Sequence, residues 1–262
     1  MLKKLLSVLR RKSHAATPSP DLWAEVERTL PCLNRLTPED RRTLRSMALD
    51  FLHDKVFAGA AGFESDAKVR LSIALQACLP VLRLGLHSYA GWRGIVVYPG
   101  DFAIPRQETD EAGLHHEYLE DALGEAWEGG PVVLGWFADM ADYAGANVVI
   151  HEFAHQIDML NGDADGNPPL HAGMDRAAWN TAMAAAFDDL GKRIDAGEET
   201  ALDPYAAEHP GEFFAVCAEV FFTQPEVLYA SYPEVFQQLE LFFRQNPLAL
   251  PPPPRLRRHS RQ

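Results

Sequence analysis

The sequence predicts an α+β fold that is mostly helical and carries a small β-sheet. Apolar residues recur every three or four positions in several long segments, which is the spacing of helices that bury one face. Two short runs are instead rich in β-branched residues and are bounded by Gly and Pro, as strands are. The length of 262 residues and the hydrophobic share of 47% indicate a globular protein that can bury a large core.

In the first half of the chain, we expect helices over residues 22–30, 37–57 and 67–86. The second of them has a clear start, because the Thr37 hydroxyl can cap it and Pro38 suits the first helical position. Strands are expected over 95–98 and 132–136. Strand 132–136 either offers its edge to an extended peptide or lies inside the sheet, and the sequence favours neither alternative.

In the second half, a helix is expected to begin after Asn147, a suitable cap, and to end at Asn161-Gly162. Further helices are expected over 177–190, 210–223 and 235–245. Residues 163–167 (Asp-Ala-Asp-Gly-Asn) partly match a calcium loop, but Met174 stands where the closing glutamate of such a loop is required. We therefore expect a turn there and no calcium site.

These elements form one expected domain over residues 20–247. A basic segment, 1–19, precedes it and a Pro/Arg-rich tail, 248–262, follows it, and we expect both to be mobile. The apolar stretch of the first segment is too short and broken for a signal peptide, and no run elsewhere reaches the roughly 18 to 20 apolar residues of a membrane span. The expected location is therefore the cytoplasm.

The net charge and the cysteine content argue against several classes of function. A net charge of −13 argues against direct binding to nucleic acid, whose phosphates are also negative. The three cysteines, Cys32, Cys78 and Cys217, lack the paired spacing of zinc ribbons or redox motifs. We expect them to be buried free thiols in a reducing compartment.

The motif His151-Glu152-Phe153-Ala154-His155 carries the strongest chemical signal. On a helix, residues four apart lie on one face, so His151 and His155 can bind the same metal ion. Glu152 can then take a proton from a water bound to that metal. The pattern indicates metal-assisted hydrolysis, with peptide bonds as the expected substrate.

Two histidines do not complete such a site, because catalytic zinc usually keeps three protein ligands. Glu212 and Glu219 are favoured for the third, since they lie seven residues apart on one face of an apolar helix, where acids are rarely buried without a partner. Spacing alone does not choose between them. The remaining candidates are His115, His116, His171, His209 and Glu208.

A series of ordered motifs resembles the Mlc titration factor A family of bacterial zinc metallopeptidases, whose catalytic domain is similar to that of anthrax lethal factor. The resemblance extends over roughly residues 20 to 247. The matching segments are Gly62-Phe63-Glu64, Leu79-Pro80-Val81-Leu82, Val97-Tyr98-Pro99, and residues 130–134, 150–158 and 205–222. It implies a zincin-like, specifically gluzincin-like, metallopeptidase domain.

By this resemblance, His151, His155 and Glu212 hold one zinc ion, Glu152 is the catalytic base, and the Tyr205 phenol faces the reacting carbonyl. The resemblance also implies that Glu219 is not a zinc ligand and instead supports the ligands or the fold. The resemblance also implies aminopeptidase-like activity on peptide substrates and binding of a glucose-system transcriptional repressor, Mlc, either beside the peptidase activity or as the main function.

Asp158, one turn beyond His155, either orients a histidine ligand through its second ring nitrogen or is a solvated acid at the helix end. The sequence leaves both alternatives open.

Overall fold

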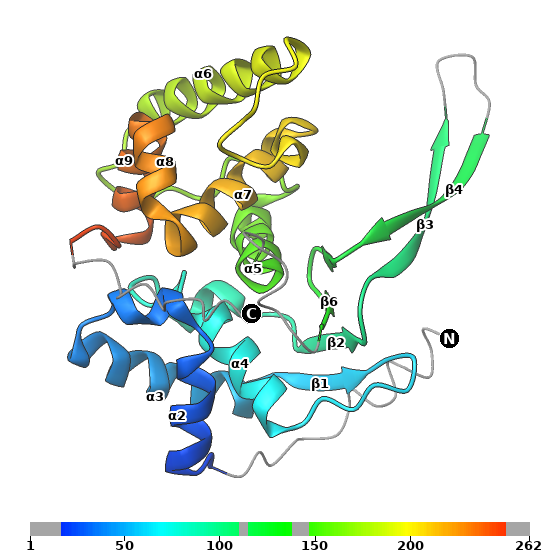
Figure 1. The fold of residues 1–262 in the computed structure, drawn as a ribbon, viewed down its shortest axis with the longest axis vertical. Helices are drawn as coiled ribbons and strands as arrows, with labels where there is room; N and C mark the ends of the chain where they lie inside the picture. The colour runs from blue at the N-terminus through cyan, green and yellow to red at the C-terminus, as the bar shows by residue number, and fades with distance from the viewer. Residues whose placement is uncertain (1–16, 110–114, 138–146, 250–262) are drawn as a thin grey trace, which may run out of the picture.

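The structure is a computed structural model that describes residues 17–109, 115–137 and 147–249, with the side chains of 104–122 left out. Helix α5 (Val148–Asp158) runs through its middle, between two groups of elements (Figure 1). One group holds the sheet with helices α2 (Pro20–Arg28), α3 (Pro38–Asp54) and α4 (Ala67–Cys78). The other holds α6 (Arg176–Asp195), α7 (Pro210–Thr223), α8 (Pro225–Ser231) and α9 (Pro233–Phe243).

Short 3₁₀ helices connect these elements. They are η1 (Pro31–Arg35), η2 (Leu86–Tyr89), η3 (Met159–Asn161) and η4 (Pro204–Ala207). The observed architecture is α+β and mostly helical, which confirms the predicted fold class.

The main sheet has the strand order β1-β2-β6-β5. Its strands are β1 (Val56–Gly59), β2 (Gly94–Tyr98), β6 (Val132–Gly135) and β5 (Gly124–Ala126). Strand β6 pairs with β2 in parallel and with β5 antiparallel, so it lies inside the sheet and the alternative of an open edge there is wrong. A separate antiparallel ribbon, β3 (Phe102–Thr109) and β4 (His115–Ala122), extends away from the body (Figure 1).

Aromatic side chains anchor helices α5 and α7 in the core. Phe153 of α5 is fully buried, with its ring centroid 5.0 Å from that of Tyr89 and 5.7 Å from that of Trp92. Phe214 of α7 is also fully buried and packs with its ring centroid 6.1 Å from that of Phe242. Aromatic pairs at such distances bury large areas and favour one geometry, so both helices are fixed by the core.

The expected strands 95–98 and 132–136 and the helix caps at Thr37 and Asn147 are confirmed. Two expected helices end early. The helix predicted to reach residue 57 stops at Asp54, because the next residues pair with β2 as strand β1. The helix predicted to reach residue 86 stops at Cys78, two residues before Pro80, which lacks the N–H needed to continue it.

Among the described residues, no helix is both long enough and apolar enough to span a membrane. The two terminal segments that were expected to be mobile lie almost wholly outside the described residues.

Candidate metal centre

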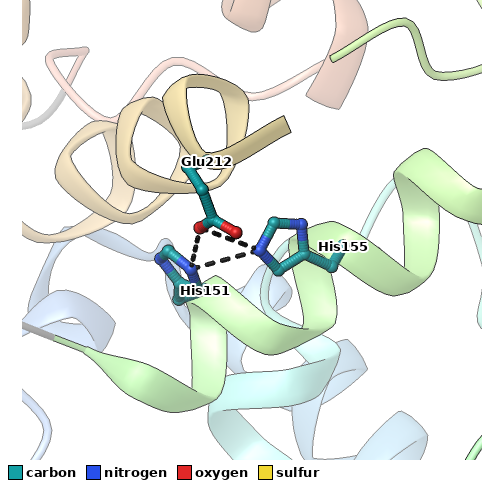
Figure 2. A group of neighbouring side chains, drawn as sticks. All are labelled: His151, His155 and Glu212. Carbon is teal, nitrogen blue, oxygen red and sulfur yellow. Dashed lines mark hydrogen bonds and ion pairs between the residues drawn. The ribbon is translucent and has the colours of Figure 1, made fainter. Parts of the chain in front are cut away.

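Local sequence explains how α5 presents its histidines. The Asn147 side chain accepts a hydrogen bond from the backbone N–H of Ile150 at 3.0 Å, which caps the helix. Phe153 turns one face of the helix into the aromatic core. His151 and His155, two residues to either side, therefore lie on another face, which is directed toward α7 (Figure 2).

Helix α7 brings in Glu212 from its first turn. The His209 ring caps this helix by accepting a hydrogen bond from the Gly211 N–H at 3.1 Å, and Pro210 occupies the first turn. The positive end of the helix dipole favours a carboxylate at this position.

The side chains of His151, His155 and Glu212 point toward one another from the two helices (Figure 2). The Oε2 atom of Glu212 lies 3.0 Å from Nε2 of His151 and 3.2 Å from Nε2 of His155. The two Nε2 atoms are 3.2 Å apart. Three ligand atoms of the kinds that zinc prefers thus converge on one point.

The spacing of these atoms fits a zinc ion. Zinc bonds of about 2.0–2.2 Å in tetrahedral geometry separate neighbouring ligand atoms by about 3.4 Å. The observed separations of 3.0 to 3.2 Å are shorter by only a few tenths of an ångström. Small movements of side chains would therefore open the triangle enough for the ion.

The electrostatics of the cluster favour a cation at its centre. Burial disfavours the charged form of His151, but the carboxylates of Glu212, Glu219 and Glu152 outweigh this effect and raise its pKa to about 10. Burial likewise disfavours the Glu212 carboxylate, yet the two histidines hold its pKa well below the usual range. A bound metal ion would supply positive charge among these carboxylates and would need the histidine nitrogens that bind it in their deprotonated form.

Glu152 lies beside this cluster and is only 4% exposed. Burial raises its pKa above the ordinary glutamate value, which suits a group that must accept a proton and later give it back. Edge strand β5 covers it: a Cβ added to Gly124 would lie 2.3 Å from Oε1 of Glu152. This contact is not predictable from the sequence, because residues 124–126 are too few to show a strand pattern.

Tyr205, in η4, stands at the open side of the site. It is 41% exposed, and its ring centroid lies 6.2 Å from that of His151. The phenol is therefore close to the cluster and accessible to a molecule that binds there.

Most of the other candidate ligands are engaged elsewhere or lie apart from the cluster. His171 bonds through Nε2 to the carbonyl oxygen of Phe242 at 2.7 Å, His209 caps α7, and Glu208 is exposed after η4. His115 and His116 begin strand β4, and their side chains lie outside the part that the structure describes. Glu219 is buried near His151 but contacts its other ring nitrogen, Nδ1, at 3.7 Å.

Asp158 is fully buried, so the alternative of a solvated acid is wrong. Its Oδ2 accepts a hydrogen bond from the backbone N–H of Gly166 at 2.7 Å, and burial raises its pKa to about 7. It therefore holds the turn at residues 163–167, while its Oδ1 has no hydrogen-bond partner among the described residues and makes no bond to a histidine ring.

The chain matches the sequence profile of the glucose-regulated metallo-peptidase M90 family over residues 6–244. It is 38% identical over 223 residues to a protein named Mlc titration factor A from Escherichia fergusonii, with 84% of each chain covered. Proteins of the same name from Cronobacter sakazakii and Salmonella gallinarum are 36% identical over 242 residues and 35% identical over 240 residues. These alignments cover 91% of both chains for the first, and 90% of this chain and 91% of the relative for the second.

Proposed function

Because the chain belongs to the glucose-regulated metallo-peptidase M90 family, we propose that it is a zinc-dependent peptidase of the HExxH type with aminopeptidase-like activity. The observation that carries the proposal is the convergence of His151, His155 and Glu212 within hydrogen-bonding distance of one another, beside a buried glutamate. A closed structural zinc site would need a fourth protein ligand and would leave Glu152 without a role.

In this proposal, His151, His155 and Glu212 hold the zinc ion and Glu152 moves the proton. A bound zinc ion lowers the pKa of its water ligand from 15.7 to about 7. Glu152 would accept a proton from that water and later donate it to the departing amine, a role for which its raised pKa is suited. Tyr205, exposed beside His151, donates a hydrogen bond to the oxygen on which negative charge develops.

The substitution Glu152→Gln tests the proposal. The amide keeps the size of the side chain but cannot accept the proton, so hydrolysis of a panel of amino-acid anilides should fall by about 10²–10⁴-fold. Zinc content, measured by atomic absorption, should stay at one ion per chain. Glu234→Gln, an exposed glutamate on α9, removes the same charge and serves as the control. A fully active Glu152→Gln protein would refute the assignment.

A second candidate function is binding of an Mlc-like transcriptional repressor, and the printed name of the relatives favours it. Repressor binding needs a protein surface and no proton transfer. Purified Mlc from Escherichia fergusonii should therefore be recovered equally by the wild-type chain and by Glu152→Gln in a pull-down. Recovery by neither protein would exclude this partner, and loss on Glu152→Gln alone would argue against binding as the main function.

We also propose that both functions operate in the cytoplasm. Cys32, Cys78 and Cys217 are all buried and free, as cysteines commonly are in a reducing compartment.

A further inference from the structure

We propose that Glu219 is a positioning residue for His151: it holds the ring by Nδ1 so that Nε2 is presented to the metal. The inference rests on the proposed function, because it concerns how a metal ligand is held. His151 directs Nε2 toward Glu212 at 3.0 Å, and the Oε2 atom of Glu219 faces the other nitrogen, Nδ1, at 3.7 Å. One ring is thus placed between two carboxylates of the same helix.

The position of Glu219 is itself fixed. It is 6% exposed in an apolar part of α7, where a carboxylate needs partners. Its Oε1 atom accepts a hydrogen bond from the backbone N–H of Asn147, the cap of α5, at 2.5 Å. The Asn147 amide in turn donates to Oε1 of Gln76 in α4 at 2.8 Å. The carboxylate is therefore part of a chain of contacts through three helices and cannot turn away freely.

The separation of 3.7 Å between Nδ1 of His151 and Oε2 of Glu219 is longer than a hydrogen bond. The three ligand atoms must separate by a few tenths of an ångström to accept zinc, because they lie 3.0 to 3.2 Å apart. A shift of the His151 ring away from Glu212 would move its far nitrogen toward Glu219. Histidine ligands of metals commonly donate their second N–H to a carboxylate, which fixes the ring and strengthens the ligand.

The contact with Glu219 concerns one of the two histidines. Among the described residues, Nδ1 of His155 is buried and has no hydrogen-bond partner, and the same holds for Oδ1 of Asp158, which interacts with His155 electrostatically. Removal of the Glu219 carboxylate should therefore change how the His151 ring is held and leave His155 in place.

The substitution Glu219→Gln separates this role from the simpler one of holding the start of α5. The carboxylate offers two acceptors to two donors, the Asn147 N–H and the His151 Nδ1–H. An amide offers one acceptor and one donor, so it can keep the bond to Asn147 only by turning its NH₂ group toward His151. The helix cap is then preserved while the ring loses its acceptor.

Two measurements on the full chain test the proposal. Zinc affinity, from competition with a chelator, should be about 10–100-fold weaker in Glu219→Gln than in wild type. In zinc-loaded wild-type protein, the Nδ1 proton of His151 should give a downfield NMR signal that is protected from exchange with water, and Glu219→Gln should lose it. Glu234→Gln, with the same change of charge at an exposed site, should alter neither quantity.

Wild-type affinity together with an unchanged Nδ1 signal in Glu219→Gln would overturn the inference and leave the proposed function intact. Failure of the wild-type chain to bind zinc would overturn the proposed function first. If Glu219→Gln does not fold, the wild-type spectrum alone decides, because an unprotected Nδ1 proton in the zinc-loaded protein excludes the contact.

Discussion

Tyr205 differs from the other residues of the candidate site because it is exposed. His155 and Glu152 are buried and His151 nearly so, whereas Tyr205 lies at the surface with its ring beside that of His151. Tyr205 can therefore contact a substrate, although it is not one of the three residues proposed to bind the metal. Its proposed task, donation of a hydrogen bond to a developing oxyanion, therefore depends on its hydroxyl alone.

Tyr205→Phe should lower kcat by about 10²–10³-fold, because it removes one oxyanion donor and keeps the ring. KM and zinc content should change little. Steady-state kinetics on the best anilide substrate and metal analysis provide the check. Tyr229→Phe, on an exposed tyrosine of α8, is the matched control. A kcat close to wild type in Tyr205→Phe would remove this residue from the mechanism.

At the residue scale, sequence predicted the convergence of His151 and His155 but could not choose between Glu212 and Glu219. Seven residues are about two helical turns, so both acids face the same way and spacing carries no further information. The structure separates them by position along α7: Glu212 contacts Nε2 of both histidines, and Glu219 lies behind His151 at Nδ1. Only the crossing of α7 over α5 creates this difference.

At the scale of elements, the turn at 163–167 is packed against the start of α7. A Cβ added to Gly211 would lie 2.2 Å from the carbonyl oxygen of Ala164, and one added to Gly166 would lie 2.6 Å from that of Pro210. Both contacts are with backbone, which cannot move as a flexible side chain can. Asp158 holds the same turn from α5. The packing of this turn against the start of α7 therefore helps to position α7, and with it Glu212, relative to the two histidines.

Gly211→Ala should lower the free energy of unfolding of the metal-free protein by about 1–3 kcal/mol, because the added methyl overpacks this contact. Zinc affinity should fall as well, since Glu212 is the next residue. Urea unfolding and chelator competition measure the two effects.

Gly191→Ala is the control for this substitution. Gly191 lies inside α6, and a Cβ there would meet nothing within 4 Å. Alanine should stabilise that helix by about 0.5–1 kcal/mol. If Gly211→Ala and Gly191→Ala had the same effect on the free energy of unfolding and on zinc affinity, close packing at Gly211 would not determine the position of α7.

The sequence predicts the helices and strands that carry an apolar pattern of their own. It does not predict the short strands whose conformation depends on pairing with a neighbouring strand. The expected helix 210–223 and strands 95–98 and 132–136 carry their own apolar patterns, and the structure has them at 210–223, 94–98 and 132–135. Strand β1 has four residues, and the expected helix 37–57 includes the first two of them, although pairing with β2 decides their conformation. Strand β5 has three residues and exists through pairing with β6.

At the scale of the whole molecule, the fold class followed from the sequence but the arrangement did not. Helical and strand periods report which face of each element is buried. They do not report which elements meet. Helix α5 lies between the two groups of elements, and Glu212 reaches it from α7, 57 residues beyond His155. That meeting is produced by tertiary packing, which only the resemblance to a known family anticipated.

Gly124 shows how this arrangement constrains change over evolution. A methyl group at this position would collide with Cγ, Cδ and Oε1 of Glu152, all of which belong to a side chain that can swing aside. The fold would therefore tolerate the change, while the side chain of Glu152, the proposed base, would be displaced. If the proposed function holds, a descendant that keeps all five residues of the motif but carries a side chain at position 124 would be inactive, and a search for the motif alone would count it as active.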